Sequence, residues 1–307
     1  MRTVPDRVAR GHTDGAIPLD RAIAKLVPLL PEEVFPVARP DWVPQSVDVS
    51  VPSIARAYDF MLGGAHNFAV DREIALKIDK MMPGLRGGTR VNRAFLGRVV
   101  RFMVDQGVRQ FLDLGSGIPT VANVHEVAQD ADPTCRVVYV DRDPIAVAHS
   151  ELMLADNDRA EMVAADLRDV EDVLTSPEVQ RLLDFSQPVG LLMLLLLHWV
   201  PDESKPREVL ARYRDALPPG SFLAISHVSA DTMGDPLYRA AELINSSGSA
   251  DQLTIRTHGE ILELLDGFEL LDPGLVGCAE WRPGGPGDIS DRHEINMLLY
   301  GAVGRKV

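Results

Sequence analysis

The chain has 307 residues, of which 46% are hydrophobic and 25% charged, a composition typical of a globular protein with a sizeable core. This length favours one large α/β domain with additions, or one domain with a small cap. Acidic residues outnumber basic ones, 45 against 31, so the formal net charge is −14. Because that charge repels phosphates and anionic lipids, we expect no nucleic-acid and no membrane partner, although one small anionic ligand could bind locally.

Cysteine content and the N-terminus predict a cytoplasmic setting. Cys135 and Cys278 are far apart and form no CxxC motif, so we expect neither a disulfide framework nor a thiolate metal cluster. The N-terminus lacks the apolar segment of a secretory signal. The longest apolar run, residues 189–197, is too short to cross a bilayer and is better explained as a buried parallel strand.

Residues 1–48 are rich in proline, which prevents a long helix. We expect an extended arm there, with one short helix over residues 20–30. Residues 49–106 change to a helical pattern that predicts a lid of three helices, over residues 53–62, 70–82 and 89–105. Gly63 and Gly64 end the first of them. The third helix carries four arginines that we interpret as a solvated basic face: Arg90, Arg93, Arg98 and Arg101.

From residue 107 onward, short β-rich runs alternate with helical stretches, which predicts a parallel sheet with helices on both faces. A polar, partly helical insert over residues 229–257 interrupts this domain of residues 107–307. The last two expected strands, residues 267–276 and 296–306, are not joined by a helix and should pair antiparallel. The other expected strands span residues 109–115, 136–141, 160–166, 189–200 and 221–228.

The strongest motif is DLGSG, residues 113–117, at the end of the first expected strand. Its two glycines permit a tight turn and a close approach of a ligand, and the helix N-terminus that follows suits an anionic group. A dinucleotide-binding loop would carry a third glycine, where this chain has Thr120. A carboxylate in the turn would repel a pyrophosphate but accept hydrogen bonds from an ammonium, so the motif predicts an amino-acid moiety. The expected contacts are Asp113, Gly115, Ser116 and Gly117.

Acidic residues also end the next two expected strands. Asp141 stands where a carboxylate can accept hydrogen bonds from both ribose hydroxyls, with Asp143 as a second candidate. Asp166 ends the third strand, where it can accept from an adenine amino group. An amino acid joined to a nucleoside is S-adenosyl-L-methionine, which we therefore expect as the cofactor. The expected nucleoside contacts are Asp141, Arg142, Asp166 and Leu167.

These motifs resemble a known group of enzymes. DLGSG, YVD, AAD and the later PPGSFLAIS are similar to class I S-adenosylmethionine-dependent methyltransferases over residues 107–307. VPSIARAYDFMLGGAHNFAVDRE, DLGSGIPTVANVHEVA and YVDRDPIAVAHSE resemble, more specifically, the actinobacterial DUF574 family, from residue 50 to the end. The resemblance implies a Rossmann-like, doubly wound, seven-stranded and mostly parallel sheet with an antiparallel last strand. It also implies an N-terminal helical lid over the cofactor, but it supplies no substrate.

The expected lid carries polar groups that could close over the methionine end of the cofactor. Arg72 could pair with the carboxylate, and Asn67 can both donate and accept hydrogen bonds. A capped helical hairpin with ordinary surface polar groups is the alternative, and the family resemblance favours the first. The expected cofactor contacts in the lid are Tyr58, Gly63, Asn67 and Arg72.

The fourth strand should end beside the transferred methyl group. Methyl transfer mainly requires the two reactants to be positioned, and histidine is a suitable base when the acceptor atom carries a proton. We expect His198 as the catalytic residue, with His227 as the second candidate, and either could instead be structural. Scattered histidines and the absence of an HExxH motif predict no metal site. The acceptor pocket is expected to contain His66, Trp199, Asp231 and Tyr238, with Trp281.

The sequence thus predicts a bacterial S-adenosylmethionine-dependent methyltransferase that moves a methyl group to O, N or C of a small molecule in specialised metabolism. Two alternatives stay open: a non-catalytic regulator or partner subunit that binds S-adenosylmethionine, and a nicotinamide-dependent oxidoreductase. A Ser/His/Asp hydrolase is disfavoured because the chain has no GxSxG elbow. A homodimer is compatible with the sequence.

Overall fold

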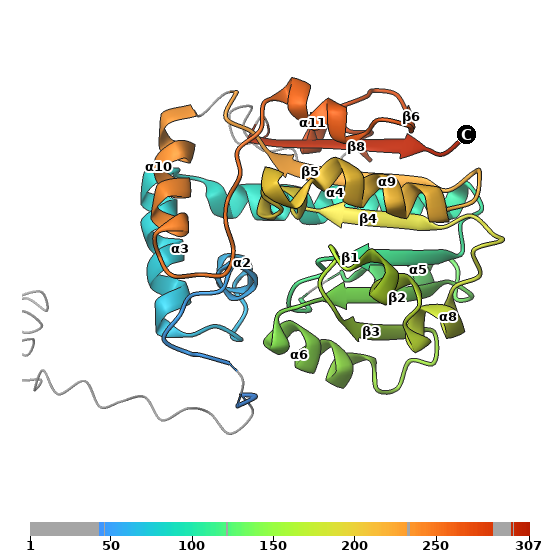
Figure 1. Ribbon diagram of the computed structural model, residues 1–307, viewed down its shortest axis with the longest axis horizontal. Helices are drawn as coiled ribbons and strands as arrows, with labels where there is room; N and C mark the ends of the chain where they lie inside the picture. The colour runs from blue at the N-terminus through green and yellow to red at the C-terminus, as the bar shows by residue number, and fades with distance from the viewer. Residues whose placement is uncertain (1–42, 46, 121, 232–233, 285–295, 297) are drawn as a thin grey trace, which may run out of the picture. The chain divides into compact units, whose positions relative to one another are not determined.

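The computed structural model describes residues 43–45, 47–120, 122–231, 234–284, 296 and 298–307. These residues belong to one compact unit, Trp42–Val307. Nearly all of the expected N-terminal arm, including the helix over residues 20–30, lies outside the described residues. Within the unit, a central eight-stranded sheet carries helices on both faces (Figure 1).

The strands of the sheet follow the order β3-β2-β1-β4-β5-β8-β6, and β7 also pairs with β8. The first five strands are parallel to one another. β8 is antiparallel to β5, and this arrangement confirms the expected fold class. The strands are β1 (Gln110–Leu114), β2 (Arg136–Asp141), β3 (Ala160–Ala164), β4 (Gly190–Leu194), β5 (Phe222–Val228), β6 (Glu269–Leu270), β7 (Val276–Gly277) and β8 (Leu299–Arg305).

The stretch expected as one strand over residues 267–276 is divided in the structure. It forms β6 and β7, both antiparallel to β8, and the sheet therefore has eight strands where seven were expected. Between the two, Pro273 lacks a backbone donor and Gly274 has a φ of 87°, so the chain leaves the sheet there.

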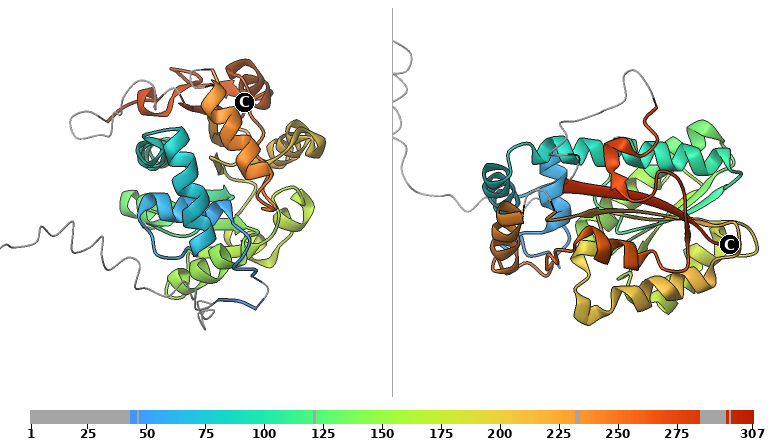
Figure 2. Two further views of the ribbon diagram at one scale, coloured as in Figure 1. Left: turned by 90° about the vertical axis from the view of Figure 1, so that its left-hand side faces the viewer. Right: turned by 90° about the horizontal axis from the view of Figure 1, so that it is seen from above.

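Helices pack on both faces of the sheet because alternate residues of each buried strand point to opposite sides. Phe111 of β1 packs in a cluster with α4 (Leu85–Asp105), α5 (Val124–Ala131) and the end of α6 (Pro144–Leu154). Leu112 and Leu114 pack in a second cluster on the other face. That cluster includes residues of α7 (Val170–Leu174), α8 (Pro177–Leu182), α9 (Pro206–Ala216) and α11 (His258–Leu264). Figure 2 shows α4 and the pair α9 and α11 on opposite sides of the sheet.

Three helices lie beyond the carboxyl ends of the parallel strands (Figure 1): α2 (Ile54–Leu62), α3 (Ala69–Met81) and α10 (Gly234–Asn245). We call these three helices the lid. The helix expected as the third lid helix, over residues 89–105, is α4, which packs on one face of the sheet. Gly63 ends α2 with a φ of 90°, as the sequence indicates. α10 comes from the insert expected over residues 229–257, and it packs against α3. The lid is therefore built from two segments that are far apart in the chain.

Two of the element boundaries that differ from the expected ones have a clear physical reason. α4 begins at Leu85, about one turn before the expected start at Thr89, because Gly88 and Thr89 are buried in the fold and packing overrides the low helix propensity of glycine. β4 ends at Leu194 although the apolar run continues, because Leu195 has a φ of 50° and turns the chain into a short 3₁₀ helix, Leu197–Trp199. No helix among the described residues is long and apolar enough to cross a membrane.

Asp71 of α3 connects α3 to the start of α2. This fully buried carboxylate accepts hydrogen bonds from the backbone N–H of Ser53 at 2.9 Å and of Phe68 at 2.8 Å, and from Nε of Arg56 at 2.9 Å. Arg56 is itself almost fully buried. A buried charge that loses its partner is strongly destabilising, so Asp71 should contribute strongly to the stability of the α2–α3 part of the lid.

We predict that Asp71→Asn lowers the free energy of unfolding by about 3 kcal/mol, because it leaves the Arg56 guanidinium buried without its counter-charge. Urea denaturation followed by circular dichroism measures this loss. The matched control is Glu73→Gln on the same helix, which removes only an exposed ion pair with Lys77 and should not change the midpoint. Equal midpoints for the two variants would contradict the prediction.

Candidate functional site

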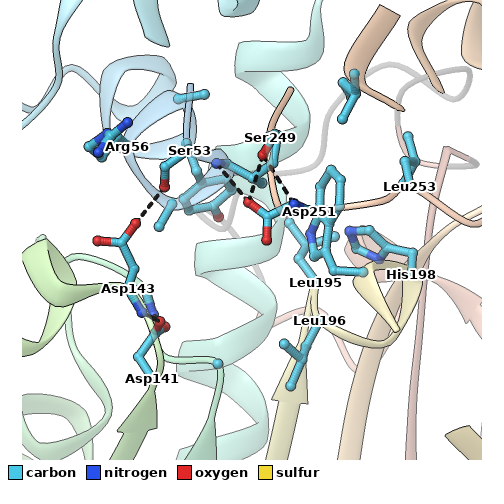
Figure 3. Close-up of a pocket in the computed structure, with 18 of the residues that line it drawn as sticks. Ser53, Arg56, Asp141, Asp143, Leu195, Leu196, His198, Ser249, Asp251 and Leu253 are labelled. Atoms are coloured by element: carbon cyan, nitrogen blue, oxygen red, sulfur yellow. Dashed lines mark hydrogen bonds between the residues drawn. The ribbon is translucent and has the colours of Figure 1, made fainter. Parts of the chain in front are cut away.

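A cavity of about 540 Å³ lies where β1 to β4 end, between these strand ends and the lid. Its volume is within the range of small-molecule sites, about 300–1,000 Å³. Figure 3 shows cavity side chains that come from separate regions, among them Ser53 before α2, Asp141 at the end of β2, and His198 after β4. Residues of the lid and of several strand ends therefore line the same cavity.

The turn after β1 forms one wall of the cavity. Gly115 and Gly117 have φ values of 64° and 69°, a conformation that favours glycine. A Cβ on Gly115 would lie 2.2 Å from Cδ1 of Leu196, whereas one on Gly117 would meet nothing within 4 Å. Ser116 lines the cavity, and its buried Oγ has no hydrogen-bond partner among the described residues. The turn thus offers open backbone and an unused hydroxyl to a ligand.

Asp113 is a buried carboxyl at the end of β1. Burial raises its pKa to about 7, the nearby Arg93 guanidinium lowers it, and the Asp141 carboxylate raises it. Arg93 of α4 lines the same cavity, and its guanidinium also donates to the carbonyl of Ala122 at 3.1 Å. An acidic and a basic side chain therefore lie close together beside the turn, and a bound ammonium group would favour the ionised form of Asp113.

Asp141 links the turn after β1 to the turn after β2. Its carboxylate accepts from the N–H of Gly117 at 2.7 Å and of Asp143 at 2.8 Å. Burial raises the pKa of Asp141 to about 6 even though these bonds oppose the shift. Asp143 accepts from the N–H of Ile145 at the start of α6 and from the hydroxyl of Ser53 at 2.6 Å. The turn after β2 is therefore bound to the lid.

Asp166 is held by two arginines. Burial opposes its ionisation, but hydrogen bonds from the side chain and N–H of Arg168 and the charge of Arg142 lower its pKa to about 2. Its oxygens accept two bonds from the Arg168 side chain, one from the Arg168 N–H and one from Arg142. Arg142 also donates to Asp251 at 2.7 Å. Because the carboxylate already accepts four bonds, an adenine amino group would compete with an arginine there.

The lid residues named from the sequence are divided between two places. Tyr58 lines the cavity, and burial raises its pKa, so it keeps its proton at neutral pH. Gly63, Asn67, Arg72 and His66 are absent from the described cavity wall. The buried Asp59 carboxylate accepts from Nδ2 of Asn67 at 2.8 Å and from the N–H of His66 at 2.9 Å, and Arg72 donates to Asn67. These contacts fit the capped hairpin that we kept as the alternative.

The two histidines have different surroundings. His198 is buried, lines the cavity, and its Nδ1 has no partner among the described residues. Burial lowers its pKa well below the usual range, so it is neutral at pH 7. His227 lies outside the described cavity wall. Its Nε2 is 3.2 Å from the guanidinium of Arg256, which can only donate, and its Nδ1 is 2.6 Å from the carbonyl of Val228.

His227 is therefore a neutral imidazole with hydrogen on Nδ1 and both nitrogens bonded. Burial lowers its pKa to about 3. Arg256, buried behind it, also donates to the carbonyls of Leu197 and Val200, both at 2.8 Å. This arrangement supports the structural alternative for His227 and leaves His198 as the histidine that faces the cavity.

The remaining acceptor candidates are also separated by the structure. Trp199 lines the cavity, whereas Asp231 and Tyr238 are absent from its described wall. Asp231 accepts from the N–H of His258, and Tyr238 is 53% exposed on α10. Trp281 is fully buried in the core, edge-on to Phe95. Of these residues, only Trp199 is placed to contact a bound molecule.

The structure adds wall residues that the sequence did not single out. Arg93 belongs to the four arginines interpreted as a solvated face, but it lines the cavity beside Asp113. Asn92 is a buried polar residue on the adjacent position of α4, and Asp251 comes from the insert. A helical projection of α4 places Asn92 beside apolar positions, and this is the sequence signal that indicates a buried position for Asn92.

We predict that the ligand-free protein loses stability as pH rises from about 4 to 7 because of Asp113. A carboxyl with a raised pKa binds its proton more tightly in the folded chain than in the unfolded chain, whose pKa is about 3.9, so folding is favoured at the acidic end of this window. Asp113→Asn should therefore raise the melting temperature above pH 7 and change it little near pH 4. Differential scanning calorimetry across this range tests the prediction, and a melting-temperature change of equal size at both ends would contradict it.

Comparisons with known proteins agree with this geometry. A family model described as S-adenosyl methyltransferase matches residues 40–307. A solved structure from Thermobifida fusca YX, described as a putative methyltransferase, is 40% identical, with 87% of this chain and 99% of that chain covered and a TM-score of 0.80. A DUF574 family protein from Streptomyces avermitilis MA-4680 is 35% identical, with coverages of 85% and 99% and a TM-score of 0.81. No curated protein matches the chain.

The family model covers most of the chain, and both solved relatives are covered almost completely. The resemblance noted in the sequence is therefore confirmed, and with it the cofactor and the reaction type. The chain belongs to the S-adenosyl methyltransferase (DUF574) family and is an S-adenosylmethionine-dependent methyltransferase.

Proposed function

We propose that the enzyme binds S-adenosyl-L-methionine across the ends of β1, β2 and β3 and methylates a small molecule held in the same cavity. The observation that carries this proposal is the pair of opposite charges beside the first turn. Asp113 could accept from the cofactor ammonium, and Arg93 could pair with its carboxylate, at one end of one cavity. The partnerless Oγ of Ser116 and the open face of Gly117 suit the same moiety.

The nucleoside would lie toward β2 and β3. Asp141 accepts backbone hydrogen bonds from Gly117 and Asp143, and a carboxylate has about four acceptor positions, so it can still accept from a ribose hydroxyl. Leu167 lines the wall next to Asp166 and offers an apolar surface to the adenine ring. Since the Asp166 oxygens are occupied by arginines, we assign Asp166 and Arg142 to the shape of this wall rather than to a strong adenine contact.

The cofactor supplies a methyl group on a positively charged sulfur. The protein would mainly position the cofactor and the acceptor, because the turn after β1 and the segment after β4 approach each other at Gly115 and Leu196. The lid would exclude water from the reacting atoms. His198 would receive the proton when the acceptor atom is a hydroxyl or an amine, since its Nδ1 is unpaired among the described residues.

A small-molecule acceptor is supported by the cavity and by charge. The site lies between strand ends and a lid rather than on an open surface, and the net charge of −14 opposes binding of nucleic acid. Both cysteines are free and buried, which fits a reducing cytoplasm. The sources of the two relatives support a bacterial enzyme. A role in specialised metabolism and a homodimer stay predictions.

We predict that Asp141→Asn weakens binding of S-adenosylhomocysteine roughly 10- to 100-fold, because hydrogen bonds to a charged group contribute about 1.5–3 kcal/mol. Isothermal titration calorimetry measures this change. Asp166→Asn should weaken binding less, because that carboxylate is occupied by Arg168 and Arg142. Asp172→Asn, on the exposed start of α7 and outside this cavity, is the matched control and should bind normally.

Unchanged affinity in Asp141→Asn would move the ribose contact elsewhere. If the wild-type protein did not bind S-adenosylhomocysteine at all, the assignment of this cavity to the cofactor would fail. If the protein does bind S-adenosylhomocysteine, the acceptor can be identified by a screen of small molecules with methyl-labelled S-adenosylmethionine, beginning with metabolites linked to neighbouring genes.

With an acceptor in hand, His198→Asn should lower kcat about 100-fold while the affinity for S-adenosylhomocysteine stays unchanged, as expected for loss of a general base. His227→Asn should mainly lower thermal stability, because it disturbs the bonds to Arg256 and Val228. Steady-state kinetics with calorimetry separates these effects. A kcat that falls only in the His227 variant would reverse the two roles.

A further inference from the structure

The cavity has a charged part and a neutral part. Its charged wall residues come from the start of the lid, from Arg93, from the turns after β1, β2 and β3, and from Asp251. The described wall residues from α3, α10, the first two turns of α4 and the start of β8 include no Asp, Glu, Lys or Arg. We call this second part, with Met61 at its α2 side, the neutral end. Its apolar side chains include Met61, Ile78, Leu85, Leu237, Ile244 and Leu298.

The apolar side chains of the neutral end pack together. Ile78 of α3, Leu237 and Ile244 of α10, and Leu298 belong to the same buried cluster, against which Met61 and Leu85 pack. A carboxylate or ammonium placed there would lose its hydration without gaining a counter-charge, which is costly. The part of a ligand that fills this end is therefore uncharged.

One polar chain of contacts reaches this surface. The hydroxyl of Ser226 accepts from the N–H of Leu195 at 2.8 Å and donates to Oδ1 of Asn92 at 2.6 Å. This orients the Asn92 amide so that its Nδ2 donates to Oη of Tyr58, 3.3 Å away. The Tyr58 hydroxyl then keeps its own hydrogen to donate.

Tyr58 has no strong acceptor for that hydrogen among the described residues. The carbonyl of Thr89 is 3.4 Å away, longer than the usual 2.7–2.8 Å of an O–H···O bond. Tyr58, Asn92 and Thr89 all line the cavity. A ligand oxygen at normal distance would give the hydroxyl a better partner than the protein does.

We propose that the neutral end binds a neutral, largely apolar methyl acceptor whose hydroxyl is hydrogen-bonded by Tyr58. This inference rests on the proposed function, which places the cofactor at the charged end. It reassigns Tyr58, expected from the sequence to contact the cofactor, to recognition of the acceptor. Asn92 acts as a positioning residue, because it reaches the acceptor only through Tyr58.

The test uses the full chain saturated with S-adenosylhomocysteine and three probes of one shape: β-naphthol, naphthalene and β-naphthoate. Their dissociation constants are measured by fluorescence titration at pH 7. We expect β-naphthol to bind at least tenfold more tightly than the anionic β-naphthoate and several-fold more tightly than naphthalene. Tyr58→Phe should remove the advantage of β-naphthol over naphthalene while the affinity for S-adenosylhomocysteine stays unchanged.

Tyr238→Phe is the matched control, since it removes the same hydroxyl from an exposed residue outside the described cavity wall. The inference is overturned if β-naphthoate binds as tightly as β-naphthol, if no probe binds the saturated protein, or if Tyr58→Phe leaves the probe ratio intact. A Tyr58→Phe variant that loses S-adenosylhomocysteine but keeps the probe ratio returns Tyr58 to the cofactor. Failure of the wild type to bind S-adenosylhomocysteine removes the proposed function and this inference with it.

Discussion

The carboxylate of Asp141 connects the parts that enclose the cavity. Its two backbone hydrogen bonds hold the turn after β1, at Gly117, against the turn after β2, at Asp143. Asp143 then caps α6 and accepts from Ser53 at the start of the lid. Because bonds from backbone N–H groups to a carboxylate are strong, this series of contacts determines the shape of the charged end. These hydrogen bonds therefore connect the strand ends and the start of the lid around the ligand site.

Surroundings, rather than residue type, give the three strand-end carboxyls different properties. Burial raises the pKa of Asp113 and Asp141, whereas Arg168 and Arg142 hold the pKa of Asp166 low despite its burial. Asp113 and Asp141 keep acceptor positions that a cationic, hydroxyl-bearing ligand could use. The acceptor positions of Asp166 are occupied by Arg168 and Arg142. The same distinction applies to the histidines: His198 faces the cavity, and His227 is bonded on both nitrogens.

Much of this fold could be predicted from local patterns. Alternating β and α stretches indicated the parallel sheet, and the DLGSG turn marked the end of β1, because both depend on short-range periodicity and glycine conformation. The start of α4 and the end of β4 were placed wrongly, since packing keeps Gly88 helical and turns the chain at Leu195. Arg93 was interpreted as solvated. Helical periodicity assigns a residue to a face of a helix, but it does not reveal which part of the fold packs against that face.

The sequence by itself determined the family, the cofactor and the carboxylates at the strand ends, because these are carried by residues that are close in the chain or at regular spacing. Only the tertiary structure decided which side chains share the cavity. It brought Arg93 of α4 to Asp113, Ser53 to Asp143, and α10 of the insert to α3. These contacts join segments separated by long stretches of chain, and no local pattern records them. The neutral end, where we propose that the acceptor binds, combines residues of α2, α3 and α4 with residues of α10 and of the start of β8.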